Sequence, residues 1–247
     1  MSKVVGILGG MGPEATVDLF AKIVKNTPAR RDQDHLRIVV EDDPSIPDRT
    51  AAIFEGGPDP LPAMLEAGRR LIGAGADFIV IPCNTAHHFY ERLAGGLPVP
   101  VLHIMEETAR FIARDHPAAR RIGLLATTGT VWTGLYDRAL AKRGLTVLHP
   151  APAVQEQIME AIYGRDGIKA GHYDRPRELL TAAGRSLVES GADVVVAGCT
   201  EIPLVLKPGL LPVPVIDATE ALALAAVTEA LDGVPGGGER QDGQGRE

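Results

Sequence analysis

The chain repeats one local pattern around each of its two cysteines, and this repeat restricts the fold more than any other feature. Cys83 and Cys199 lie 116 residues apart, while Gly6 and Gly123, in two similar glycine-containing segments, lie 117 apart. A nearly constant offset between separate landmarks predicts two homologous lobes with a ligand held between them. Each cysteine follows a Gly-Ala-Asp turn and an apolar run, and precedes small polar residues that can open a helix, in the segments Gly75-Ala76-Asp77-Phe78-Ile79-Val80-Ile81-Pro82-Cys83-Asn84-Thr85 and Gly191-Ala192-Asp193-Val194-Val195-Val196-Ala197-Gly198-Cys199-Thr200-Glu201.

Apolar strands and amphipathic helices alternate along the chain, which is typical of an α/β fold with parallel sheets. The predicted fold has two pseudo-symmetric lobes, each a parallel sheet flanked by helices. We expect the active site in the cleft between the lobes, beyond the carboxyl ends of the strands. The pattern predicts strands at 4–8, 36–41, 78–82 and 213–216, and helices at 13–26, 61–73 and 219–231.

The predicted lobes are discontinuous in sequence, because the last helix is expected to pack on the first lobe. The first lobe comprises residues 1–104 and 210–232, and the second comprises residues 105–209. Residues 233–247 have no apolar pattern, so we expect them to form a disordered tail without a function.

Charge and hydropathy exclude several classes of partner. The net charge is −7 and no basic cluster stands out, which argues against nucleic acid and anionic membranes as partners. The first residues run directly into a predicted strand without a signal-peptide pattern, and the apolar stretch 222–227 is too short to cross a bilayer. We therefore expect a soluble cytoplasmic protein, in which the two thiols are reactive or buried rather than bridged.

Both cysteines are predicted to stand at strand ends beside helix starts, a position that favours the thiolate. A two-base racemase needs one base deprotonated while the other is protonated, and a free thiol pKa of about 8.5 makes both states reachable. Without pyridoxal phosphate, the carbanion left by the α-proton must be stabilised by donors around the α-carboxylate. Suitable donors follow the strands, namely Asn84, Thr85, Thr127, Thr128, Gly129, Thr130 and Thr200.

Other interpretations fit these residues less well. A lone cysteine at a strand end is commonly a small core residue, but the duplicated setting argues against this for the pair. His87, His88 and Glu91 lie on one predicted helix, yet adjacent histidines do not share a helix face, which disfavours a metal site. The segment 10–15 matches a lax dinucleotide fingerprint, but Pro13 lacks the N–H that a pyrophosphate needs there.

Five motifs follow one another along most of the chain, from about residue 3 to 231. They are Gly6-Ile7-Leu8-Gly9-Gly10-Met11-Gly12-Pro13, Ile46-Pro47-Asp48-Arg49-Thr50, Pro82-Cys83-Asn84-Thr85-Ala86-His87, Leu125-Ala126-Thr127-Thr128-Gly129-Thr130 and Gly198-Cys199-Thr200-Glu201. Together they closely resemble the pyridoxal-phosphate-independent aspartate racemases of the aspartate/glutamate racemase superfamily. The resemblance implies an isomerase without a cofactor or metal, a small amino-acid substrate and commonly a homodimer. The implied reaction interconverts L- and D-aspartate, with glutamate as a second acidic candidate.

The resemblance also assigns roles to individual residues. Cys83 and Cys199 would be the two acid/base thiols. Arg49 matches an arginine of the family, and Lys169 matches a lysine used for the substrate's acidic groups. The other residues expected to contact the substrate are Met11, Asn84, Thr85, Thr128, Gly129, Thr130, Thr200 and Glu201.

One segment departs from the family pattern. Asp42-Asp43-Pro44 stands where the family commonly has Asn-Asn-Pro, and two carboxylates would repel a dianionic substrate unless they turn away or pair with a cation. Turn formation before Pro44 is the simplest explanation. The alternatives are a substrate that is not strictly acidic, or a contact between one of these carboxylates and the substrate's ammonium group.

Two other classes of function stay open on the sequence alone. The same scaffold could carry another amino-acid racemase, a hydantoin racemase, a maleate isomerase or a decarboxylase. The last two reactions need no symmetric pair of proton donors, so the presence of both cysteines argues against them. A non-catalytic amino-acid or nucleotide sensor with two lobes is the remaining alternative.

Overall fold

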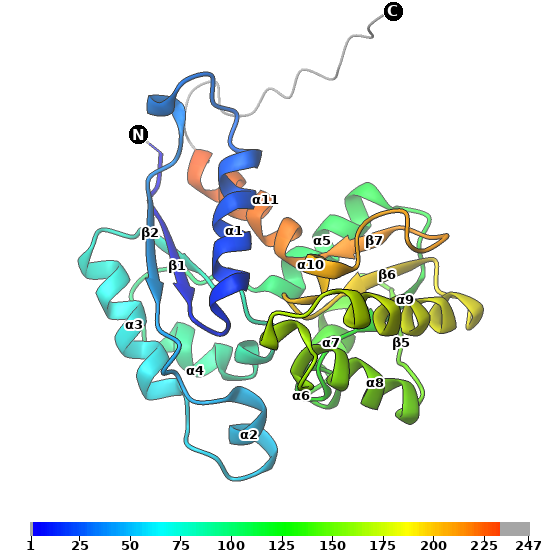
Figure 1. Cartoon of the computed structure of the whole chain (residues 1–247). Coiled ribbons are helices and arrows are strands. Elements are labelled where there is room, and N and C mark those ends of the chain that lie inside the picture. Colours follow the sequence, from blue (N-terminus) through cyan, green and yellow to red (C-terminus); the bar gives the residue numbers. More distant parts are fainter. Residues whose placement is uncertain (1, 233–247) are drawn as a thin grey trace, which may run out of the picture.

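The computed structural model describes residues 2–232 and contains two parallel sheets flanked by helices (Figure 1). The first sheet has the strand order β2-β1-β3, and the second has the order β5-β4-β6-β7. The predicted α/β class with two parallel sheets is confirmed, whereas the tail predicted at 233–247 lies outside the described residues. The strands are β1 (Val5–Gly9), β2 (Ile38–Asp42), β3 (Phe78–Val80), β4 (Arg121–Leu125), β5 (Thr146–Leu148), β6 (Val194–Ala197) and β7 (Val215–Asp217).

The helices connect these strands as the alternating pattern predicts. The expected helices 13–26 and 61–73 have the predicted bounds, and the last helix begins one residue earlier than predicted. The α-helices are α1 (Pro13–Asn26), α2 (Arg49–Phe54), α3 (Leu61–Gly73), α4 (Tyr90–Gly95), α5 (Ile104–Asp115), α6 (Thr128–Trp132), α7 (Leu135–Ala141), α8 (Pro152–Tyr163), α9 (Asp174–Glu189), α10 (Ile202–Val205) and α11 (Ala218–Leu231), and the short 3₁₀ helices are η1 (Asp32–Asp34), η2 (Thr85–Phe89) and η3 (Ile168–Ala170).

The strand before Cys83 is shorter than predicted. β3 ends at Val80, because Pro82 has no N–H to donate to the sheet and the Cys83 N–H turns back to the carbonyl of Ile81 at 2.8 Å. This turn places Cys83 just beyond the carboxyl end of the strand and two residues before η2.

The repeated Gly-Ala-Asp turn has the same structural role in each lobe. Gly75 and Gly191 follow α3 and α9 with φ values of +97° and +91°, which glycine adopts without strain. Asp77 then accepts a hydrogen bond from the backbone N–H just before β1 at 2.7 Å, and Asp193 accepts one from the first N–H of β4 at 2.8 Å. Each turn is therefore tied to the beginning of the neighbouring strand.

The glycines of β1 and β4 allow this turn to pack closely. A Cβ on Gly6 would stand 2.8 Å from the Cβ of Ala76, and one on Gly123 would stand 3.2 Å from the Cβ of Ala192. A side chain at either position would push the turn away from its strand. The two landmarks found in the sequence thus support the same contact in both lobes.

A central apolar cluster joins the two lobes. It contains Val5 and Ile7 of β1 together with Ile122 and Leu124 of β4, and two further clusters cover the outer faces of the sheets. Helix α11 packs against α1 and α5, as Figure 1 shows, while β7 belongs to the second sheet. The proposed division of the chain at 104/105 and 209/210 stays a prediction.

Neither a membrane-spanning helix nor a metal-binding cluster is found in residues 2–232. No helix there is both long and apolar enough to cross a bilayer. No group of three or more His, Cys, Asp or Glu side chains in this range is arranged to hold a metal ion.

Candidate functional site

The two cysteine segments meet between the lobes. Cys83 and Cys199 are both free thiols, and each is 6% exposed. The hydroxyl of Thr200, which follows Cys199, donates a hydrogen bond to the carbonyl of Pro82, which precedes Cys83, at 3.2 Å. The strand ends that carry the two thiols are therefore in direct contact, as the repeat predicts.

Glu201 organises the side of the site around Cys199. The Cys199 Sγ donates to Oε2 of Glu201 at 3.0 Å, and Thr200 Oγ1 lies 3.3 Å from the same oxygen. Lys169 forms an ion pair with the other oxygen, Oε1. Burial raises the pKa of the Cys199 thiol well above its usual value, and the negative charge of Glu201 raises it further. The Cys199 thiol is therefore held in its protonated form.

Lys169 belongs to the same charged group. Burial alone lowers the pKa of Lys169, but the negative charge of Glu201 and the hydrogen bond to it outweigh this effect, so the pKa is raised. The ammonium also lies 5.4 Å from the ring centroid of Tyr163. Lys169 is thus a fixed cation near both thiols.

Arg49 supplies a second cation, from the first lobe. It opens α2 and is 8% exposed, and its guanidinium donates to the carbonyls of Pro47 at 3.0 Å and Ile46 at 3.2 Å. Burial lowers the pKa of Arg49, but the charge of Cys83, followed by that of Asp48, raises it overall. Within residues 2–232 the guanidinium forms no ion pair with a carboxylate.

Three threonine hydroxyls join the lobes beside the cysteines. Thr85 Oγ1 lies 3.0 Å from Thr127 Oγ1 and 3.1 Å from Thr130 Oγ1, and all three residues are buried. Gly129 makes this contact possible, because a Cβ there would stand 2.9 Å from Cγ2 of Thr85. The predicted donors Thr85, Gly129 and Thr130 are thus brought together.

Several buried polar atoms at the cleft have no partner within the described chain. They are Nε of Arg49, Oγ1 of Thr50 and Nδ2 of Asn84. All three can donate a hydrogen bond, and a buried donor without an acceptor is costly. Donors of this kind suit an incoming carboxylate.

His87 supports the backbone of Cys83 rather than a metal ion. Its Nε2 accepts the N–H of Ile104 at 3.2 Å, so Nδ1 carries the proton and donates to the carbonyl of Cys83 at 2.9 Å. Burial, followed by the neighbouring His103, lowers the pKa of His87 to about 3. The ring is therefore neutral and holds the Cys83 backbone in place.

Three predicted residues contribute differently from Arg49 and Lys169. Met11 is 3% exposed, and its carbonyl accepts from Arg49 at 3.4 Å. Thr128 lines a neighbouring cavity, and its N–H points at Sδ of Met159 at 3.2 Å. Asp43 accepts from Ser45 and lies 3.6 Å from Arg70, so its carboxylate forms a turn and pairs with a cation outside the cleft.

The sequence did not indicate three residues that the structure places here. A cavity of about 410 Å³ between the lobes is bordered by Arg49, Lys169, Glu201 and also Tyr163. Thr50 presents a buried hydroxyl, and Tyr136 donates to Oδ1 of Asn84 at 2.8 Å. Only the neighbourhood of Thr50, inside the second motif, could have suggested its role from the sequence.

Replacing Tyr136 with phenylalanine should lower the free energy of unfolding by about 1–3 kcal/mol, because Oδ1 of the buried Asn84 loses its donor. Urea unfolding followed by circular dichroism measures the change. Tyr90 is the matched control, since its hydroxyl donates to the Val101 carbonyl at 2.9 Å from a partly exposed position. Tyr90→Phe should cost less, and an equal loss in both variants would contradict the prediction.

Phe54 is expected to position α2, and with it Arg49, through Trp132 of the second lobe. Their rings meet edge to face with centroids 5.1 Å apart. Such a pair contributes about 0.5–1.5 kcal/mol. Phe54→Ala should therefore raise the KM for a substrate held by Arg49 by about two- to tenfold. Trp132 is the single tryptophan of the chain, and its fluorescence reports the loss of contact. Phe20→Ala is the control, because both phenylalanines are 41% exposed. Equal KM values for the two variants would refute this role.

Comparisons with known proteins agree with this arrangement. The sequence profile of the family described as Asp/Glu/Hydantoin racemase matches residues 8–226. The broad specificity amino-acid racemase RacX of Bacillus subtilis (strain 168) is 31% identical over 233 residues, which cover 92% of this chain and 98% of that protein. A glutamate racemase of Aquifex pyrophilus is 32% identical over 170 residues, 65% of this chain and 61% of that protein.

A solved structure extends the similarity to the fold. The aspartate racemase of Picrophilus torridus superposes with a TM-score of 0.82 at 32% identity, covering 92% of this chain and 94% of that one. The family profile spans both cysteine motifs and both sheets. The chain therefore belongs to the Asp/Glu/hydantoin racemase family, whose members are isomerases that act on small substrates.

Proposed function

We propose that this protein interconverts the two enantiomers of an amino acid without a cofactor, using Cys83 and Cys199 as a pair of acid/base groups. The observation that carries the proposal is the direct contact between the two cysteine segments, through Thr200 and Pro82. The two thiols are equally buried but have opposite surroundings, a carboxylate beside Cys199 and a guanidinium near Cys83. One thiol is thereby suited to give a proton and the other to take one.

The proposed reaction proceeds in two proton transfers. The thiolate of Cys83 takes the α-proton from one face of the substrate, and the electron pair remains on the α-carbon. The S–H of Cys199 then gives its proton to the opposite face, which inverts the centre and leaves Cys199 as the thiolate. In the reverse direction the roles exchange, so the pair of sulfurs carries one proton before and after each turnover. Hydrogen bonds from the buried unpartnered donors stabilise the charge that develops on the α-carboxylate.

Aspartate is the proposed substrate, with glutamate as a second acidic candidate. Arg49 is a buried cation without a carboxylate partner in residues 2–232, so it can pair with a carboxylate of the substrate. Lys169, by contrast, already pairs with Glu201. The aspartate racemase of Picrophilus torridus and the broad specificity racemase of Bacillus subtilis support an amino-acid substrate of this kind.

The location and assembly are part of the same proposal. The resemblance to aspartate racemases favours a cytoplasmic homodimer. Sedimentation velocity of the purified chain tests the dimer, and a single species at the monomer mass of 26.1 kDa would refute it.

The decisive experiment is incubation with single enantiomers in D2O, without added cofactor. We expect both L- and D-aspartate to exchange their α-proton, lose optical purity and converge on equal amounts of the two forms. Glutamate, alanine and a 5-substituted hydantoin complete the panel. Absence of exchange with every compound would overturn the proposal. Exchange with the hydantoin alone would show that the substrate is a hydantoin rather than an amino acid.

A further inference from the structure

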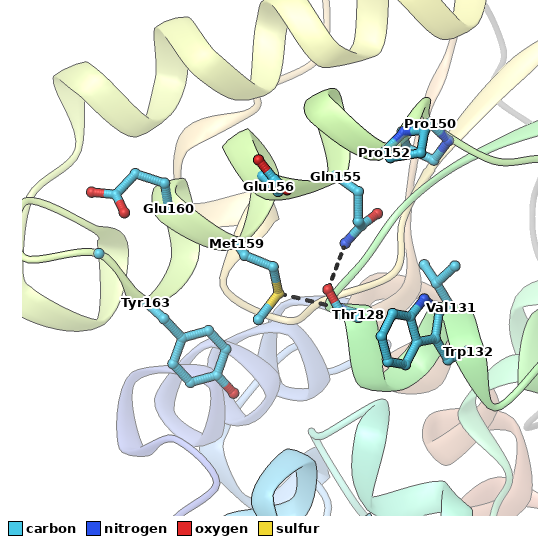
Figure 2. A pocket seen from close by; sticks show the side chains of 11 residues that line it. Thr128, Val131, Trp132, Pro150, Pro152, Gln155, Glu156, Met159, Glu160 and Tyr163 are labelled. Carbon is cyan, nitrogen blue, oxygen red and sulfur yellow. Dashed lines mark hydrogen bonds between the residues drawn. The ribbon is translucent and has the colours of Figure 1, made fainter. Parts of the chain in front are cut away.

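A second cavity, of about 600 Å³, lies beside α8 in the second lobe (Figure 2). This volume lies within the range typical of small-molecule sites. Much of its wall is apolar and comes from Val131, Trp132, Pro150, Pro152 and Met159. Neither the proposed proton transfers nor the binding of a small acidic side chain uses this space.

The second cavity adjoins the catalytic cleft through Tyr163. Tyr163 lines both cavities, so it forms a wall between them. The Lys169 ammonium, which pairs with Glu201 beside Cys199, lies 5.4 Å from the centroid of the Tyr163 ring, which places this ring next to the cleft that holds the thiols. The two cavities therefore share this ring as a boundary, and a side chain attached to an α-carbon in the cleft would enter the second cavity beside it.

The inner wall of the cavity can rearrange. Figure 2 shows Met159 and Gln155 turned toward Thr128. Sδ of Met159 accepts the N–H of Thr128 at 3.2 Å, and a thioether is a weak acceptor on a flexible side chain. A ligand can therefore displace Met159 at little cost, which also frees the Thr128 N–H for an oxygen of the substrate.

The outer wall gives a reason for an apolar ligand. Trp132 is 68% exposed, an unusual amount for the largest apolar side chain, and covering its indole would release about 25 cal/mol per Å² of apolar surface. Two exposed carboxylates, Glu156 and Glu160, border the same cavity. Their negative charges repel an anionic side chain, which can instead form an ion pair with Arg49 in the cleft.

We propose that this cavity is a subsite for long apolar or aromatic side chains, so that amino acids such as phenylalanine are substrates in addition to aspartate. This inference rests on the racemase activity proposed above and extends its substrate class. The α-carbon stays between the two thiols, and the side chain extends past Tyr163 to lie against Trp132 and Met159.

The test compares α-proton exchange of phenylalanine and alanine in D2O for the full chain and its variants. Val131→Phe fills the cavity and should lower the ratio of kcat/KM for phenylalanine to that for alanine at least about tenfold, the effect of a lost apolar contact of about 1.4 kcal/mol. Trp132→Ala removes an exposed wall, and should lower the same ratio through KM. Val24→Phe is the control, since Val24 lies exposed on α1 away from both cavities, and its ratio should match the wild type.

Binding is also measurable without turnover. Phenylalanine should change the fluorescence of Trp132 in a saturable way, and Val131→Phe should abolish the response. Exchange of alanine and aspartate without exchange or fluorescence change for phenylalanine would overturn this inference and leave the proposed function intact. Exchange of phenylalanine at an unaltered ratio in Val131→Phe and Trp132→Ala would also overturn the assignment. Absence of exchange with all amino acids would refute the proposed function and this inference together.

Discussion

Replacing either Cys83 or Cys199 with alanine is expected to lower the kcat for racemisation by roughly 10²–10⁴-fold, the usual contribution of one general acid or base. Each single variant keeps one thiol, so it can still exchange the α-proton on one face of the substrate. Cys199→Ala should exchange one enantiomer with retention, because Cys83 removes a proton and returns a deuteron on the same side. Cys83→Ala should do the same for the other enantiomer.

These outcomes distinguish a two-base mechanism from a one-base mechanism. Optical rotation follows racemisation, and mass spectrometry follows deuterium at the α-carbon, for each enantiomer in each variant. The double alanine variant, with a circular dichroism spectrum to show that it folds, is the control and should lose exchange with both enantiomers. Racemisation within a few-fold of wild type in either single variant would contradict the two-base proposal.

The placement of each cysteine just beyond a buried strand could be predicted from the sequence, because the patterns that indicate it are local. The Gly-Ala-Asp turn, the apolar run and the cysteine lie within nine residues, and each has a physical meaning in isolation. The turn before Pro44 is also confirmed for Asp43, because Asx turns depend on adjacent residues, here Ser45. Helix bounds such as those of α1 and α3 follow from periodicity in the same way.

The contacts between the lobes could not be predicted from local patterns. Tyr136 reaches Asn84 across 52 positions of the chain, and Thr200 reaches Pro82 across 118. Tyr163 closes α8 before a glycine, and a tyrosine there resembles any helix end. Which side chains face one another is decided by how the two sheets pack on their shared core, not by the spacing within either motif.

The opposite surroundings of the two thiols lead to the second large effect. Glu201→Gln is expected to make Cys199 react with iodoacetamide on the order of tenfold faster near pH 8. The carboxylate beside Cys199 raises the pKa of this thiol, so replacing it with a neutral amide lowers that pKa. Lys169 then lacks its ion-pair partner, and its positive charge lowers the thiol's pKa further. At a pH below the pKa, a lower pKa means a larger thiolate fraction and faster alkylation.

The two cysteines provide an internal reference for this measurement. Both are 6% exposed, so a difference in their alkylation rates reports the thiolate fraction rather than access. Mass spectrometry of peptides assigns each adduct, since the chain has no other cysteine. Asp48→Asn is the matched control, because it removes a carboxylate from the same cavity and retains a side-chain oxygen for the Ala51 N–H. We expect Cys199 to react at the wild-type rate in that variant. An unchanged alkylation rate of Cys199 in Glu201→Gln would show that burial alone keeps this thiol protonated. Glu201 would then have no part in setting the protonation state of Cys199.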